Sequence, residues 1–215
     1  MFDQYREAVQ GSVAEVGAGI GTFSERMLAV GAERLLLLEP EPSCAQILEQ
    51  RFGGDGRVRI AREELPDAPT LREGGYDLIV CQNVLEHVED DDAAVRAMAA
   101  GLKPGGRLAL LVPAHPRLFG PLDETYGHHR RYTRERARAV VSAAGLEIDD
   151  LYSFNLLGVA GWWAMNRRPG ARLSDRSLAA YEAMVRFWRP VEEMIRLPWG
   201  LSLIVQARRP PTNTS

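Results

Sequence analysis

The sequence predicts an α/β fold, doubly wound, in which helices cover both faces of one sheet. Strand and helix patterns alternate along the chain with short connections, which is typical of this class. Four consecutive leucines, residues 35–38, suit a central parallel strand that is buried on both faces. The first strand also runs into a glycine-rich loop and then into a helix, as many nucleotide-binding sheets do.

Each expected element rests on a local pattern. Short apolar runs predict strands at residues 12–16, 34–39, 58–61, 76–81, 107–112, 147–154 and 201–208. Helical patterns cover residues 22–30, 42–52, 90–102 and 133–144. Gly31 and Gly145 end two of these helices, Thr133 caps the last one, and residues 103–106 form an expected turn.

The composition indicates an ordinary globular protein. Of the 215 residues, 46% are hydrophobic and 26% are charged. We expect a single domain over residues 1–215, with an aromatic-rich insertion at about 156–199 between the last two strands. The formal net charge of −3 argues against a nucleic-acid partner, because such domains usually carry a dense basic face.

Three features bear on the compartment. Cys44 and Cys81 are too few for a disulfide framework. Residues 1–12 are polar and charged, unlike a signal peptide, and the longest apolar run, residues 155–165, is too short to span a bilayer. We therefore expect a cytoplasmic protein with no membrane contact.

The glycine loop is the first candidate binding site. Gly17, Gly19 and Gly21 alternate with other residues directly after the first strand, so a ligand can approach the backbone closely. A dinucleotide-binding fingerprint would have glycine or alanine at position 22, where this chain has Thr22. Glu15, two places before the loop, suits a ligand ammonium group and would repel a pyrophosphate.

Several segments together resemble the class I S-adenosylmethionine-dependent methyltransferases. Residues 15–21, Glu-Val-Gly-Ala-Gly-Ile-Gly, are similar to the first motif of that family. Residues 76–87 resemble its fourth motif, and residues 102–107 resemble the turn before its fifth strand. The resemblance covers residues 13–112 in the family's order. It implies a Rossmann-like, seven-stranded, mostly parallel sheet with an antiparallel last strand, and S-adenosyl-L-methionine as cofactor with S-adenosyl-L-homocysteine as product.

The resemblance also implies which residues bind the cofactor. The glycine loop would hold the methionine portion, and Glu39, at the end of the second strand, would hydrogen-bond both ribose hydroxyls. Arg62 and Glu63 stand where the family flanks the adenine, although an exposed charged turn is an equal interpretation. The full predicted set is Glu15, Gly17, Ala18, Gly19, Gly21, Glu39, Pro40, Arg62, Glu63, Gln82, Asn83 and Val84.

Residues 126–133 are the candidate acceptor loop. They resemble a Gly-His-Tyr-Arg-Arg-Tyr-Thr stretch in a subset of bacterial class I methyltransferases, with His129 in place of the usual tyrosine. His128 and His129 are the candidate catalytic bases, because a histidine titrates near neutrality. Local hydrogen bonds that only fix the loop are the alternative. No metal site is expected, because no carboxylate at a suitable spacing accompanies the histidine pair.

Candidate substrate-binding residues surround this loop. Arg130 and Arg131 could clamp an anionic group of the acceptor, or form only a solvated basic edge. Tyr126, Tyr132, Asn155 and Trp162 complete the predicted set. The insertion could close over the acceptor as a lid, form a homodimer interface or lie on a membrane surface.

These observations predict methyl transfer from S-adenosylmethionine to a small molecule of apolar or aromatic character, in bacterial natural-product biosynthesis. The alternative acceptor is a sugar or a lipid-linked glycan. Two other classes stay open on the sequence alone: a nicotinamide-dependent dehydrogenase and a non-catalytic cofactor-binding module.

Overall fold

The structure is a computed structural model that describes residues 2, 5–156, 158–159, 161–162 and 199–211. Seven strands form one sheet in the order β3-β2-β1-β4-β5-β7-β6. Strand β7 pairs antiparallel with both β5 and β6, and the other pairs are parallel. The predicted fold class is confirmed. The strands are β1 Gly11–Val16, β2 Ala32–Leu38, β3 Val58–Ala61, β4 Tyr76–Gln82, β5 Leu102–Pro113, β6 Glu147–Phe154 and β7 Ser202–Arg208.

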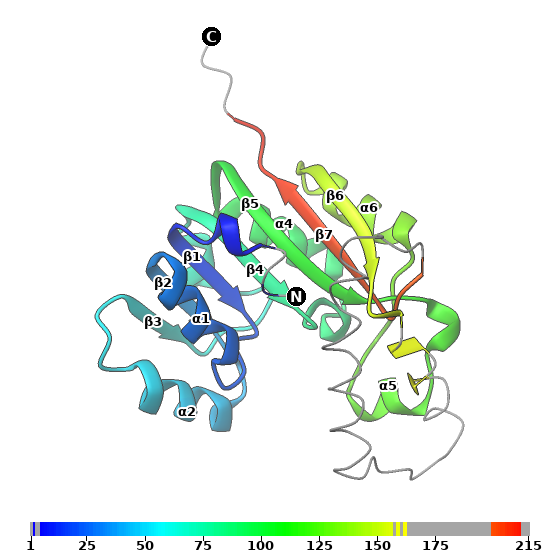
Figure 1. Ribbon diagram of the computed structural model, residues 1–215, viewed down its shortest axis with the longest axis horizontal. Helices are drawn as coiled ribbons and strands as arrows, with labels where there is room; N and C mark the ends of the chain where they lie inside the picture. The colour runs from blue at the N-terminus through cyan, green and yellow to red at the C-terminus, as the bar shows by residue number, and fades with distance from the viewer. Residues whose placement is uncertain (1, 3–4, 157, 160, 163–198, 212–215) are drawn as a thin grey trace.

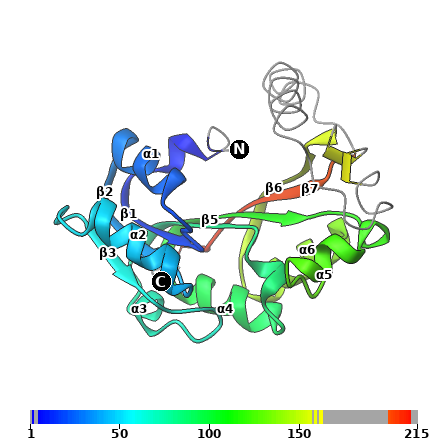
Figure 2. The ribbon, with the colours of Figure 1, turned by 90° about the horizontal axis from the view of Figure 1, so that it is seen from below.

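Helices cover both faces of the sheet. They are α1 Thr22–Val30, α2 Pro42–Phe52, α3 Pro69–Arg72, α4 Asp91–Gly101, α5 Pro121–Thr125 and α6 Arg134–Ala143. One apolar core lies between the sheet and helices α3, α4 and α6, and a second lies between the opposite face and helices α1 and α2. Figure 2 shows α1 on one side of the sheet and α4 and α6 on the other.

The leucine run explains why β2 lies inside the sheet. Leu36 and Leu38 belong to the core under α3, α4 and α6, whereas Leu35 and Leu37 belong to the core under α1 and α2. All four side chains are at most 3% exposed. Because successive side chains of a strand point to opposite faces, only a strand covered on both sides buries every residue.

Strand β5 begins earlier than expected. Residues 103–106, the expected turn, lie within β5, and the pairing with β4 shifts register between Tyr76 and Leu78. An ion pair of 2.7 Å between Lys103 and Asp77 ties this irregular start to β4. Helices α3 and α5 were not predicted, because one turn of helix is too short to show a periodic pattern.

The carboxyl ends of β1, β2, β4 and β5 lie at one edge of the sheet, where ligands bind in open α/β folds. Figure 1 shows the antiparallel pair β6 and β7 next to β5, with α5 beyond the end of β5. Most of the insertion predicted at about 156–199 lies outside the described residues. The lid, the homodimer interface and the membrane-facing surface that the sequence suggests for it therefore also lie outside them. Within the described residues, no helix has the length and apolar character needed to cross a bilayer.

Candidate functional site

A pocket of about 410 Å³ lies over the glycine loop at this edge of the sheet. Two segments that are distant in the sequence form it: the end of β1 with the start of α1, and the end of β4. The lining residues are Glu15, Val16, Gly17, Ala18, Gly19, Ile20, Thr22, Phe23, Gln82 and Asn83. The structure thus brings together six residues of the predicted cofactor-binding set.

The glycines are needed for two different reasons. Gly17 has φ +73°, and a Cβ atom there would lie 2.2 Å from Cγ2 of Val84. Gly19 has φ +55°, and a Cβ atom there would meet nothing within 4 Å. Gly17 therefore lets the loop pack against the residues after β4, whereas Gly19 keeps the backbone accessible. Side chains rarely adopt either conformation, so both positions favour glycine.

Glu39 joins the loop to the end of β2. It is buried, and its two carboxylate oxygens accept hydrogen bonds from the backbone N–H groups of Gly19, at 2.7 Å, and Glu41, at 3.0 Å. A carboxylate offers about four acceptor positions. Glu39 is thus held in place and retains capacity for hydroxyl donors of a ligand.

Glu15 is a buried carboxyl group that lines the pocket itself. Burial raises its pKa to about 7, the Ser24 hydroxyl group that donates to it acts in the opposite direction, and the negative charge of Glu39 raises it further. A cationic ligand group placed here would favour the charged carboxylate, whereas a pyrophosphate would be repelled. The pocket therefore fits a cofactor with a ribose and an ammonium group.

The other predicted cofactor residues either line the pocket over the glycine loop or lie outside it. Gln82 donates a hydrogen bond of 2.6 Å from Nε2 to the hydroxyl group of Tyr5, a buried residue that the sequence analysis did not identify. Glu63 accepts hydrogen bonds from the backbone and hydroxyl group of Thr70, so its carboxylate fixes the start of α3. Arg62 is exposed. The predicted residues that do not line the pocket over the loop are Gly21, Glu39, Pro40, Arg62, Glu63 and Val84.

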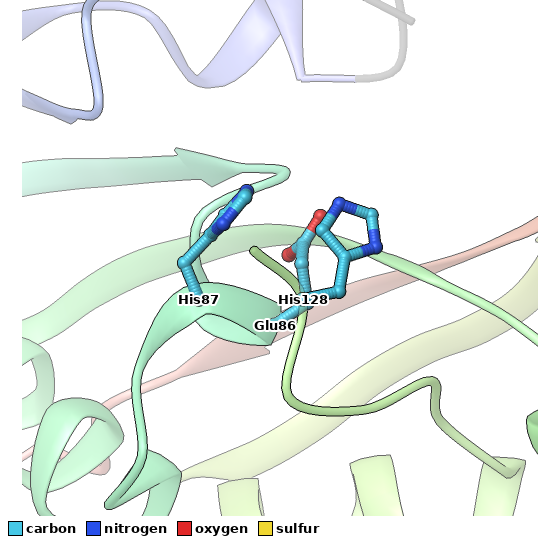
Figure 3. Close-up of side chains that lie close together, drawn as sticks. All are labelled: Glu86, His87 and His128. Atoms are coloured by element: carbon cyan, nitrogen blue, oxygen red, sulfur yellow. The ribbon is translucent and has the colours of Figure 1, made fainter. Parts of the chain in front are cut away.

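A second cluster forms at the same edge, from Glu86, His87 and His128. Glu86 and His87 lie in a 3-10 helix, residues 85–87, that follows β4, whereas His128 follows α5. One oxygen or nitrogen atom of each side chain lies within 4.8 Å of the others. The two imidazole rings are in edge-to-face contact, with their centres 4.8 Å apart, and Figure 3 shows the Glu86 carboxylate next to them.

Asp123 orients His128. Its fully buried carboxylate lies 2.8 Å from Nδ1 of His128 and accepts a hydrogen bond of 2.8 Å from Nε of Arg131. With Nδ1 engaged, Nε2 is the ring nitrogen of His128 that is left for a ligand. His129 is exposed, and its backbone N–H donates to the carbonyl oxygen of Glu86. Of the two predicted bases, only His128 belongs to the cluster.

The surroundings of the cluster shift the pKa values of two of its members, Glu86 and His87. Burial raises the pKa of Glu86 to about 7, Arg131 lowers it, and Asp123 raises it. Oε2 of Glu86 has no hydrogen-bond partner among the described residues. Burial lowers the pKa of His87, and the neighbouring His128 lowers it further.

Aromatic side chains lie next to the cluster. Tyr126 is 60% exposed, with its ring 6.2 Å from that of His128 and 6.4 Å from that of Trp162. The guanidinium group of Arg131 lies 4.5 Å from the Trp162 ring centre. Asn155 has φ +65°, and its side chain accepts a hydrogen bond from the Gly158 backbone.

Three predicted substrate residues have internal partners instead. The side chain of Arg131 is 1% exposed and pairs with Asp123. Arg130 pairs with Asp91 at 3.0 Å, and the hydroxyl group of Tyr132, itself 1% exposed, donates to the same carboxylate at 3.0 Å. These contacts argue against the predicted anion clamp, and against a substrate contact by Tyr132, because Arg130 and Tyr132 hold the loop to α4 and Arg131 holds it to α5.

Comparison with known proteins agrees with this geometry. The methyltransferase domain family matches residues 4–151. A ubiquinone biosynthesis O-methyltransferase of Xanthomonas euvesicatoria pv. vesicatoria is 29% identical over 189 residues, which cover 80% of this chain and 74% of that protein.

Solved structures share the fold at low identity. An S-adenosylmethionine-dependent methyltransferase of Mesorhizobium loti is 18% identical, with a TM-score of 0.66 and 97% of each chain covered. The [4+2]-cyclase SpnF is 21% identical, with a TM-score of 0.63, and the match covers 97% of this chain and 82% of that one. With the family match over most of the sheet, the chain belongs to the methyltransferase domain family and is a class I S-adenosylmethionine-dependent methyltransferase.

Proposed function

We propose that this enzyme transfers the methyl group of S-adenosylmethionine to a hydroxyl oxygen of a small aromatic molecule. The observation that carries the proposal is the aromatic surface of Tyr126 and Trp162 beside His128. The choice of oxygen is supported by the printed name of the Xanthomonas relative, an O-methyltransferase. An aromatic surface of this kind suits a planar, apolar acceptor.

The two halves of the site would divide the work. The glycine loop, Glu15 and Glu39 would hold the cofactor, with the ribose hydroxyls donating to Glu39 and the ammonium group beside Glu15. Glu86, His87 and His128 would contact the acceptor hydroxyl group. Alignment of the acceptor oxygen with the methyl carbon would supply most of the rate enhancement, because the transfer is a direct displacement.

Calorimetric titration with S-adenosylhomocysteine, with NAD in a parallel titration, tests the cofactor half. We expect micromolar binding of S-adenosylhomocysteine and none of NAD. Binding of NAD alone would refute the cofactor assignment and favour a dehydrogenase.

Methyl transfer from S-adenosylmethionine to catechols and simple phenols tests the acceptor half, with hexoses and aliphatic amines as controls. We expect methylation of the phenolic hydroxyl groups. Transfer to the hexoses alone would refute the aromatic acceptor and favour the glycan alternative. Transfer to the amines alone would refute the choice of oxygen.

A further inference from the structure

One oxygen of the buried Glu86 carboxylate lacks the partner that such an atom normally has. Glu86 is 1% exposed, and its Oε2 atom has no hydrogen-bond donor among the described residues. Buried carboxylates are normally hydrogen-bonded, paired with a charge or bound to a metal. One possible ligand atom each of Glu86, His87 and His128 lies within 4.8 Å of the others, and Figure 3 shows the three side chains close together.

Both histidines are held in the way that ligating histidines usually are. Nδ1 of His128 contacts the buried carboxylate of Asp123 at 2.8 Å, which leaves Nε2 for a ligand. One ring nitrogen of His87 hydrogen-bonds the backbone of Gly127, which leaves its other nitrogen. A carboxylate or carbonyl on the far nitrogen fixes the tautomer and the ring orientation of metal-binding histidines.

We propose that Glu86, His87 and His128 bind one divalent transition-metal ion, with zinc as the ion that their chemistry fits best. Two imidazoles and one carboxylate are a common set for catalytic zinc, which keeps a fourth position open. Bonds near 2.1 Å in a tetrahedron place ligand atoms about 3.4 Å apart. The three ligand atoms lie within 4.8 Å of one another, so metal binding would draw them closer together, and the exposed side chain of His87 has room to move.

The charges around the cluster permit a cation. Arg131 is the positive group that acts on Glu86, and it pairs with Asp123 at 2.8 Å while its guanidinium group lies over Trp162. Its charge is therefore largely compensated. Glu86 then supplies the negative charge that a divalent ion needs.

The open position gives the cluster a role in the proposed function, on which this part of the inference rests. A bound ion favours the deprotonated form of a hydroxyl group that it coordinates. The hydroxyl proton would leave to solvent, and the oxygen would form its bond to the methyl carbon. The carbon–sulfur bond would break with its electron pair on sulfur. His128 would then act as a metal ligand, in place of the base that the sequence predicts.

The test uses the full chain, stripped of metal with a chelator. Calorimetric titration with Zn²⁺ gives affinity and stoichiometry, and the visible absorption of Co²⁺-loaded protein reports the coordination geometry. His87→Gln and His128→Gln remove one ligand each. His129→Gln is the matched control, because His129 is exposed, adjacent in sequence and outside the cluster. Binding of S-adenosylhomocysteine verifies that each variant is folded.

We expect one Zn²⁺ ion per chain and the visible bands of a four-coordinate Co²⁺ centre. Each ligand variant should bind Zn²⁺ roughly 100-fold more weakly or worse, since even changes to the outer residues of metal sites cost 10- to 100-fold. The control should retain the affinity of the original chain. The absence of stoichiometric Zn²⁺ binding would overturn the proposal, and so would an affinity in both ligand variants equal to that of the original chain.

The same samples separate this inference from the proposed function. If chelated protein binds S-adenosylhomocysteine and methylates phenols at the full rate, the catalytic role of the metal is wrong and the proposed function stands. If one equivalent of Zn²⁺ binds through the cluster but no acceptor is methylated, the metal site is supported and the proposed function fails.

Discussion

Glu39→Gln tests the cofactor pocket with the smallest available change. The substitution removes the charge and turns one of two acceptor oxygens into a donor. In the original chain both oxygens accept backbone N–H groups, from Gly19 at 2.7 Å and from Glu41 at 3.0 Å. The NH₂ group of the glutamine would then face one of those backbone N–H groups. Both groups are hydrogen-bond donors, so that hydrogen bond would be lost. We therefore expect glutamine at position 39 to weaken the support of the loop as well as the proposed ribose contact.

The expected magnitude follows from the hydrogen bonds that are lost. A hydrogen bond to a charged group contributes roughly 1.5–3 kcal/mol. This corresponds to about a 10- to 150-fold increase in the Kd of S-adenosylhomocysteine. Removal of the negative charge near Glu15 should also lower the pKa of Glu15, because Glu39 contributes to its elevation.

Calorimetric titration with S-adenosylhomocysteine measures the effect, and Glu41→Gln is the matched control. Glu41 is exposed, stands two residues away and caps α2 through the backbone of Ser43. The control should bind S-adenosylhomocysteine as the original chain does. An unchanged Kd in Glu39→Gln, with an unchanged melting temperature, would show that Glu39 does not contact the cofactor.

Three further predictions concern stability. Because the folded-state pKa of Glu15 is raised to about 7, its contribution to stability is present below pH 4.5 and lost as the pH rises through 7. Between pH 4.5 and 8 the unfolding free energy of the original chain should therefore fall by roughly 3 kcal/mol more than that of Glu15→Gln. Denaturant titrations that give the two proteins identical pH profiles would contradict this. Gly17→Ala should cost at least roughly 1–2 kcal/mol, since its φ is +73°, whereas Gly54→Ala, with free space around the added Cβ atom, should not. Equal melting temperatures of the two alanine variants would refute the steric argument. Tyr132→Phe should destabilise the fold by roughly 1–2 kcal/mol, because the hydrogen bond to Asp91 is lost, with no change in the KM of the acceptor. A raised KM at unchanged stability would restore Tyr132 as a substrate contact.

Local sequence patterns predicted most strands of the sheet, because the residues that mark each strand lie within it or next to it. Residues 42–52 and 58–61 were predicted with the observed bounds, since a proline, a glycine pair and a short apolar run mark them. The start of β5 was missed because residues 103–106 have turn-forming composition. They lie at the irregularity in the pairing with β4, and Gly105 and Gly106 form backbone hydrogen bonds with Arg209. Pairing partners are not visible in a single segment.

The two parts of the site differed in predictability for the same reason. The cofactor pocket depends on backbone conformation within the glycine loop and on which residues end each strand, and both leave local marks. The second cluster depends on how the loop after β4 meets the loop after α5. Asp123 orients His128 from outside the cluster, yet nothing in its own sequence neighbourhood distinguishes it from other acidic residues of a first helical turn. Its distance of five positions before His128 is the only local signal that could have indicated the contact.

The acceptor loop shows how a family-like stretch can be mainly structural. Arg130, Arg131 and Tyr132 are all engaged with acidic groups of the protein, so exchange of any of them would disturb the packing of the loop. His129 lies among them but is exposed, and its backbone, which donates to Glu86, makes its contact with the cluster. Any residue can supply that backbone donor except proline. A different residue at position 129 would therefore alter the surface next to the cluster while it preserves the loop that positions His128.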